Sequence, residues 1–509
     1  MTKSRFTSAA VLARNTTFNL ASEGWLALVL FVAIPLLVKF LGEEQFGLFS
    51  LAWVVVGYLA FLDIGVSRAT TKFVSECLGK GEADQVASLT RTALVANCVM
   101  GAVAAVIAVA ISPFLVRDIF KIPASLHVQA MSVFIAVAVA LPVLLVQGVL
   151  RAVLSSYQRF DWINLVNVPA ISLQWVLATI LAWKKYDVVA VVWVAVLARV
   201  IMDLVYFLLL LALVPDLLSE LTIHLGTLRR LARFGAWVTV SQVISPLLVY
   251  LDRFLIAAFV SLAAVTVYTV PSEVFNRLAI FPSSLVATLF PAFSERGTVE
   301  TEKEKLTGFY NLTTRYLAFI LLPFFALLIL EAKDILGIWM GRQFAVEGTL
   351  VLQILALGAF FNSLARLPFA AVQALDRPDL TAKFHLLELP IYVALCVLLI
   401  PTWGIVGAAI AWTIRVSLDA SLLFWAAHRY CSLRSVWHKG LGTVLSVGVL
   451  LICGLSASHF LVQAVFPRLI YATALMLMAY VAIWKFALSS EDRPAIARVL
   501  RMAWQRPAA

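Results

Sequence analysis

Long apolar stretches dominate the chain, and each is long enough to cross a lipid bilayer as a helix. A helix needs roughly 20 apolar residues to span a hydrocarbon core about 30 Å thick, and such stretches recur from one end of the sequence to the other. The pattern predicts about fourteen spans, near residues 20–40, 46–67, 92–112, 128–150, 162–183, 188–214, 235–260, 265–292, 310–330, 349–373, 384–400, 405–427, 441–465 and 469–487.

Composition favours a membrane protein over a soluble one. The chain is 62% hydrophobic and 13% charged, whereas a soluble globular domain has about a quarter of its residues charged. No polar interruption is long enough to fold into a domain of its own. We therefore expect an all-α polytopic membrane protein whose function lies within the helical bundle.

The basic residues indicate an orientation. Most of the 39 Lys and Arg fall in the two tails and the even-numbered connections, and cytoplasmic loops carry such an excess. We expect both termini in the cytoplasm and the spans in the cell inner membrane. The net charge of +11 is explained by this bias and by anionic lipid, so nucleic acid is not an expected partner.

Three pairs of segments recur in the same order at a nearly constant offset. ARVIMDLVYFLL and IRVSLDASLLF align Arg199 with Arg415 and Asp203 with Asp419. QRFDWINLVN matches LDRPDLTAKF, and the Ser-Glu pair of KFVSE matches that of PAFSE. Such a parallel repeat is a transporter arrangement that leaves a central cleft.

The repeat predicts two pseudo-symmetric six-helix lobes around a central cavity. The N-terminal lobe covers residues 1–215 and the C-terminal lobe covers 216–430. Two more helices and a basic cytoplasmic tail follow in 431–509.

Charged residues within the spans are candidates for function, because a charge at mid-membrane costs at least about 2.5–3.5 kcal/mol. The cations are all arginines, whose forked guanidinium suits phosphate oxygens: Arg199, Arg253, Arg277, Arg315, Arg366 and Arg415. The acids within or beside spans are Glu23, Asp63, Asp203, Asp252, Glu273, Glu388 and Asp419.

Spacing separates structural from functional readings. Arg199 with Asp203 and Arg415 with Asp419 are four residues apart on a helix, which favours structural or gating pairs. Glu273 and Arg277 have the same spacing in a segment interrupted by prolines. Broken helices are where transporters place sites, so both readings stay open for Glu273 and Arg277.

Other charges lack a partner on their own helix. Asp252 and Arg253 are adjacent and point about 100° apart, so at least one of them needs a partner or cavity elsewhere. Arg366 has no acid within four residues, which favours a polar cavity. Arg68 and Lys72 lie one turn apart near the expected cytoplasmic end, where they either hold a phosphate or extend to lipid headgroups.

Catalytic motifs are missing from the sequence. It contains no Gly-x-x-x-x-Gly-Lys loop, Gly-x-Ser-x-Gly elbow or His-Glu-x-x-His motif, and its external loops are short. The scattered cysteines have no metal-ligand spacing. We expect a transporter and not an enzyme, with no metal site and no cofactor apart from a coupling cation, H⁺ or Na⁺.

Four segments carry a family resemblance: LGEEQFGLFSLAWVVVGYLAFLDIGVSRATTKFVSE, YLDRFLIAAFVSLAAVTVYTVPSEVF, LDRPDLTAKFHLLELPIY and GIVGAAIAWTIRVSLD. The chain resembles the Wzx-type polysaccharide flippases of the multidrug/oligosaccharidyl-lipid/polysaccharide exporter superfamily. This implies alternating access around a cationic cavity and transfer of undecaprenyl-pyrophosphate-linked repeat units to the periplasmic face, for O-antigen, capsule or exopolysaccharide. A polysaccharide polymerase and a chain-length regulator are candidate partners.

The resemblance also suggests roles for the charged residues. Arg253, Arg277 and Arg366 would hold the anion, together with Arg68 and Lys72. Four acids are the candidates for ion coupling: Asp63, Asp252, Glu273 and Glu388.

Three rival functions remain from the sequence. A MurJ-like lipid II flippase would share the fold and the chemical class of substrate. A cation-coupled drug exporter of the same superfamily would favour acidic over basic cavity residues. A membrane glycosyltransferase or polymerase would need a large external loop.

Overall fold

The computed structural model describes residues 9–59, 63, 65–219, 244, 247–278, 303–375, 377–431, 433, 450–451, 453–457 and 464–482. The regular elements in these ranges are all helices, which confirms the expected all-α fold. Nine of the helices in this part of the chain are long and apolar enough to cross a membrane. The chain divides into two compact units, Met1–Thr269 and Val270–Ala509.

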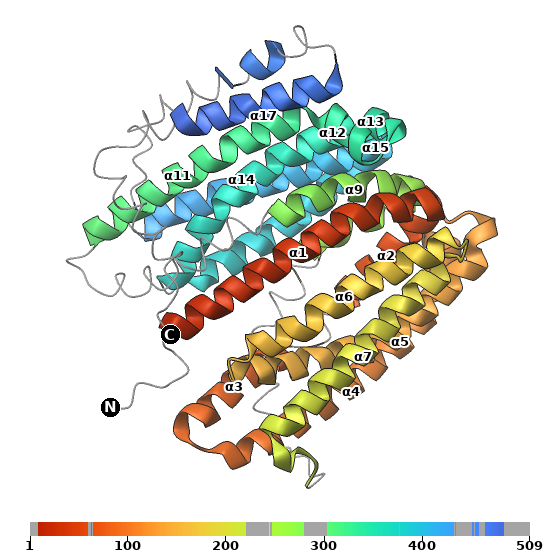
Figure 1. The fold of residues 1–509 in the computed structure, drawn as a ribbon, viewed down its shortest axis with the longest axis vertical. Helices are drawn as coiled ribbons and strands as arrows, with labels where there is room; N and C mark the ends of the chain where they lie inside the picture. The colour runs from red at the N-terminus through yellow and green to blue at the C-terminus, as the bar shows by residue number, and fades with distance from the viewer. Residues whose placement is uncertain are drawn as a thin grey trace. The chain divides into compact units, whose positions relative to one another are not determined.

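The first unit is a bundle of long helices. Its main elements are α1 (Ala9–Leu41), α2 (Glu43–Leu59), α3 (Val66–Lys80), α4 (Ala83–Phe114), α5 (His127–Ser156), α6 (Phe160–Trp183) and α7 (Val188–Leu213). α5 packs against α4 and α7, and α6 packs against α1 and α7 (Figure 1). The predicted spans near 20–40, 92–112, 128–150, 162–183 and 188–214 are confirmed by these helices.

A glycine brings α4 and α5 into backbone contact. A Cβ atom on Gly101 would lie 2.4 Å from the Cα atom of Pro142, which is closer than any real contact. Small residues at such positions let membrane helices approach closely and gain van der Waals packing. The two backbones therefore meet directly at this point of the helix pair.

The second unit contains α11 (Lys303–Leu330), α12 (Ala332–Trp339), α13 (Arg342–Glu347), α14 (Thr349–Ala374), α15 (Pro378–Tyr430) and α17 (Val465–Ala482). The preceding helix, α9 (Leu262–Leu278), begins in the first unit. α14 packs along α15, and α11 contacts both α14 and α17 (Figure 1).

α15 is a hairpin of two helical limbs, residues 378–403 and 405–430. Gly404 between them has φ 57° and ψ −134°, a conformation that favours glycine. The limbs lie against each other just past the turn, where a Cβ atom on Gly407 would be 2.1 Å from the carbonyl oxygen of Leu399. The two predicted spans near 384–400 and 405–427 are therefore confirmed.

The predicted second span, 46–67, is wrong in its extent. α2 ends at Leu59 and α3 begins only at Val66, after Gly65 with φ 68°. The apolar run hides this break because Asp63 is its only charged residue. Four other predicted spans, 235–260, 265–292, 441–465 and 469–487, lie partly outside the described residues. The total of fourteen and the lobe boundaries stay predictions.

Candidate polar cavity in the first unit

The start of α3 is fixed by Asp63. Its carboxylate accepts hydrogen bonds from the Ser67 backbone N–H at 3.3 Å and the Ser67 hydroxyl at 2.8 Å. Asn97 of α4 donates to the same carboxylate at 2.6 Å and to the Leu145 carbonyl of α5 at 2.8 Å. Asp63 therefore caps α3, since a carboxylate satisfies the unpaired amides of a helix start, and it links that helix to α4.

A cavity of about 820 Å³ lies beside this turn, between α1, α3, α5 and α6. Three charged residues line it: Glu23, Arg68 and Arg151. Its neutral polar lining consists of Ser67, Thr71, Ser155, Asn164 and Asn167. Two guanidinium groups against one carboxylate make the cavity cationic, and its hydroxyl and amide groups offer both donors and acceptors.

α3 is amphipathic and presents its cations outward. Val66, Phe73 and Cys77 are buried in the unit, whereas Arg68 and Lys72 are exposed. Arg68 lines the cavity, but Lys72 is not among the lining residues. The Lys72 ammonium lies instead 4.0 Å from Glu76 and 5.7 Å from the Phe73 ring. Of the two cations that the sequence suggested as a joint phosphate site, only Arg68 lines the cavity.

Arg151 is a site residue that the sequence reading missed. The predicted fourth span ended at residue 150, which left Arg151 in a connecting loop, whereas α5 continues to Ser156. The available signal was helical spacing, because Arg151 lies one turn after Gln147 on the same helix. Gly148, between them, also lines the cavity.

The intramembrane pair of the first unit has a third member. Gln147 of α5 donates to Asp203 at 2.9 Å and accepts from Arg199 at 3.4 Å. The Arg199 guanidinium also lies 4.8 Å from the Trp53 ring centroid. The predicted pairing of Arg199 and Asp203 is therefore indirect and passes through an amide on a neighbouring helix.

The corresponding pair of the second unit also has an unexpected partner. Arg415 contacts Glu388 across the α15 hairpin at 3.4 Å, and Asp419 lies beside Glu388. Glu388 is fully buried and Arg415 is 9% exposed. The predicted coupling residue Glu388 and the predicted structural pair therefore form one cluster.

Asp252 and Arg253 are both buried in the helix of residues 247–259. Their side chains approach only to 4.0 Å, in keeping with the poor pairing expected of neighbours. Asp252 accepts a hydrogen bond of 2.5 Å from the Tyr268 hydroxyl, and Arg253 donates to the Val249 carbonyl at 3.1 Å. Asp252 therefore has a partner on another helix, Tyr268, as the sequence predicted for at least one member of this pair.

The remaining predicted residues lie outside this cavity. Arg366 is half-buried in α14, and Glu273 is half-buried in α9. Arg277 belongs to α9, but its side chain is outside the described part of the chain. No group of three metal-ligating side chains occurs within the described ranges. The proposed roles of these residues stay predictions.

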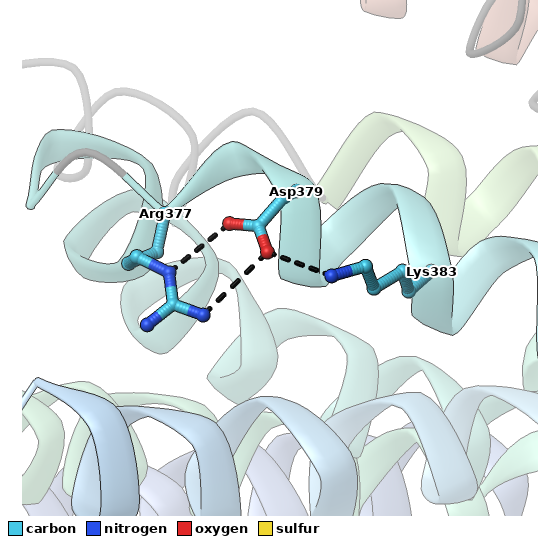
Figure 2. Close-up of polar contacts among 3 residues, drawn as sticks. All are labelled: Arg377, Asp379 and Lys383. Atoms are coloured by element: carbon cyan, nitrogen blue, oxygen red, sulfur yellow. Dashed lines mark hydrogen bonds and ion pairs between the residues drawn. The ribbon is translucent and has the colours of Figure 1, made fainter.

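A further match between the repeats is visible at the starts of α6 and α15. Arg159 binds Asp161 through two contacts of 3.1 Å, and Arg377 binds Asp379 at 3.1 and 3.5 Å. Lys383 adds a third contact to Asp379 at 3.0 Å (Figure 2). The hydrogen bond to Asp379 raises the pKa of the exposed Arg377 guanidinium.

Comparison with known proteins identifies the family. The model of a family described as polysaccharide biosynthesis protein matches residues 12–296. The chain belongs to this polysaccharide biosynthesis family. It is 30% identical over 424 residues to a Shigella flexneri protein named as a proposed O-antigen transporter, covering 82% of this chain and 98% of that protein.

Two further likenesses agree with the assignment to the polysaccharide biosynthesis family. A Haloferax volcanii protein named as a proposed flippase of low-salt glycan biosynthesis, Agl15, is 23% identical over 402 residues, 77% of this chain and 78% of its own length. Among solved structures, the lipid II flippase MurJ matches with a TM-score of 0.71 at 10% identity, over 92% of this chain and 99% of that chain.

A multidrug resistance MATE-family transporter of the MOP superfamily matches with a TM-score of 0.66 at 15% identity, over 81% of this chain and 95% of its own. These structures share the fold of a polytopic transporter. The expected resemblance to polysaccharide flippases is confirmed by the family match and by the two relatives named above, of which one is named as a transporter and the other as a flippase.

Proposed function

We propose that this protein flips undecaprenyl-pyrophosphate-linked oligosaccharide repeat units from the cytoplasmic to the periplasmic face of the inner membrane. The observation that carries the proposal is the cationic polar cavity between α1, α3, α5 and α6 in a member of the polysaccharide biosynthesis family. The glycan would serve O-antigen, capsule or exopolysaccharide synthesis. The relative from Shigella flexneri, named for O-antigen transport, supports this class of substrate.

The cavity offers separate chemistry for the two parts of such a head group. Arg68 and Arg151 can bind phosphate oxygens through charge-assisted hydrogen bonds, which are stronger than neutral ones. Asn164, Asn167 and Ser155 can exchange hydrogen bonds with sugar hydroxyls. The polyprenyl chain is as apolar as the bilayer and would remain in lipid.

The position of the cavity agrees with entry from the cytoplasm. It lies at the C-terminal end of α5 and the N-terminal end of α6, and both ends face the cytoplasm if the termini do. A repeat unit assembled on that side would therefore meet the arginines first. Alternating access would then open the site to the periplasm, where a polymerase and a chain-length regulator are the proposed partners.

The charge of the cavity argues against a drug exporter with cationic substrates. Such a carrier needs acidic groups at its site, since like charges repel in a low-dielectric cavity. Here Glu23 is the only carboxylate among the described lining residues, against two arginines.

The test is a deletion strain in which lipid-linked repeat units are quantified and assigned to a membrane face. Flipping predicts that they accumulate on the cytoplasmic face while surface glycan disappears, and that the intact gene restores export. Normal appearance of the units on the periplasmic face would contradict the proposal. Accumulation of peptidoglycan precursors in place of glycan repeat units would favour lipid II as the substrate.

A further inference from the structure

The α15 hairpin holds a buried cluster of charges that contains more acid than base. Glu388 on the first limb is fully buried and meets Arg415 of the second limb at 3.4 Å. Asp419, one turn after Arg415, lies beside the Glu388 carboxylate. Of these two carboxylates, only Glu388 forms an ion pair with Arg415. The cluster therefore contains one guanidinium and two carboxylates.

Two carboxylate oxygens in this cluster are buried and have no hydrogen-bond donor. They are Oε1 of Glu388 and Oδ1 of Asp419. A buried acceptor without a donor costs about 1–3 kcal/mol, and more when it is charged. Two carboxylates that share a site cannot both ionise easily, because their charges repel. A single proton between the two groups removes the excess charge and gives the pair a donor.

The other titratable groups around Glu388 in the described part of the chain form no ion pair with Glu388 or Asp419. His385 lies one turn before Glu388, stacks on Phe369 at 6.5 Å between ring centroids, and interacts with Asp419 and Arg415. The Tyr392 ring lies 5.4 Å from the Arg415 guanidinium. α14 packs along α15 and contains one titratable residue, the half-buried Arg366, which is not among the groups acting on Glu388.

The corresponding cluster of the first unit contains one carboxylate where the α15 cluster contains two. Arg199 and Asp203 occupy the repeat positions of Arg415 and Asp419, but their third partner is the uncharged Gln147. Its amide donates to the carboxylate and accepts from the guanidinium, so Gln147 bonds both charged groups without adding a second carboxylate. The excess carboxylate is thus a feature of the α15 cluster and is absent from its described counterpart.

A second cluster with two acids differs in its contacts. Arg468 forms ion pairs with both Glu331 and Asp334. The Arg468 guanidinium contacts both carboxylates of its cluster directly. In the α15 cluster, by contrast, the Arg415 guanidinium pairs with Glu388 and the Asp419 carboxylate lies beside Glu388.

We propose that Glu388 and Asp419 bind one shared proton, and that this site couples the proton gradient to transport. The coupling role rests on the proposed flippase function, whereas the proton site does not. The proton comes from water on one side of the membrane and returns to water on the other, with no redox change. When it leaves, the two carboxylates repel each other, which disfavours their contact across the α15 hairpin. A hard metal cation would need about six oxygen ligands, and the cluster offers only two free ones.

The proton site is tested on the purified full-length protein by infrared spectroscopy of protonated carboxyl groups during a pH titration. The wild type should show a buried protonated carboxyl, and both Glu388→Gln and Asp419→Asn should remove it, because each leaves the cluster with one carboxylate and the Arg415 guanidinium. Asp203→Asn in the first unit is the matched control and should retain the signal. A signal that persists in both α15 variants would overturn the proposal.

Loss of the signal through misfolding is excluded by measuring thermal unfolding of both variants, Glu388→Gln and Asp419→Asn. Either variant that folds suffices, since each removes a different member of the pair. Glu388→Asp keeps a carboxyl and should keep a protonated group. A wild type that shows no such group and responds to sodium instead of pH would also overturn the proton site.

Coupling is tested separately in cells. Glycan export by the wild type should fall at least tenfold when an uncoupler collapses the proton gradient, whereas Glu388→Gln should export slowly and respond less than twofold. Equal sensitivity of both proteins would overturn the coupling role. If the infrared signal behaves as expected but the deletion strain exports glycan normally, the proposed flippase function fails while the proton site stands.

Discussion

Gly148 of α5 lies directly against Ser67 of α3, so that a Cβ atom at position 148 would be 2.5 Å from the Ser67 hydroxyl oxygen. That hydroxyl is engaged, because it donates to the Asp63 carboxylate that caps α3. Both residues also line the polar cavity. The absence of a side chain at 148 therefore sets how closely the cavity wall on α3 approaches α5.

Gly148→Ala should destabilise the protein by about 1–3 kcal/mol, the usual cost of adding a methyl group to a packed site. The added methyl forces the Ser67 hydroxyl away from Asp63. Adding Ser67→Ala should recover part of the loss, because it removes the oxygen that clashes. Thermal unfolding of the two single variants and the double variant checks this, and strictly additive losses would contradict the contact.

Asp63→Asn separates the capping role of this residue from a role in ion coupling. Asparagine keeps a side-chain oxygen for Ser67 but cannot bind a transported proton. If capping is its role, export should stay within about twofold of the wild type, whereas Asp63→Ala should lose about 1 kcal/mol of stability, as for other helix caps. Export and thermal unfolding are measured for both. Loss of export in a stable Asp63→Asn protein would favour coupling.

Neutralising the cavity arginines should weaken transport. A hydrogen bond to a charged group contributes about 1.5–3 kcal/mol, so Arg68→Gln and Arg151→Gln should each lower the export rate by about ten- to a hundredfold. Lys72→Gln is the matched control, because Lys72 is an exposed cation one turn from Arg68 on α3 and does not line the cavity. It should change export less than twofold. An equal loss in all three variants would indicate a general effect of surface charge.

Arg468 should be the main attachment of α17 to the second unit. It pairs with Asp334 and, at 3.5 Å, with the fully buried Glu331. Removing one partner of a buried ion pair costs about 3–5 kcal/mol, so Arg468→Met should strongly destabilise the packing of α17. Protease sensitivity and thermal unfolding provide the measurement. Tyr480→Phe removes only the hydrogen bond to the Ile320 carbonyl and should cost about 1 kcal/mol or less.

Much of the fold could be predicted because lipid imposes a simple rule on sequence. Every spanning helix must be apolar over its length, so the runs that became α4, α5, α6, α7 and both limbs of α15 were visible. The break between α2 and α3 was not visible. It depends on Asp63 and the left-handed Gly65 inside an otherwise apolar run, where hydropathy barely changes.

The candidate site was harder to predict because its members come from four helices. Arg68 was recognised from its position near the end of a span, but Arg151 was assigned to a loop because apolarity ends before the helix does. Gln147 carries no charge, so nothing in the sequence marked it as the link between Arg199 and Asp203. Contacts between helices follow from packing, which the periodicity of one helix does not specify.

The contact of Gly101 with Pro142 has a mechanical consequence for transport. At this contact no rotatable side chain lies between the two backbones that could change rotamer and allow sliding, so α4 and α5 should move through the transport cycle as one rigid body. The part of the cavity wall that α5 forms should then keep its position relative to α4. The cavity can then widen for a bulky head group only if α1, α3 or α6 moves relative to the α4–α5 pair.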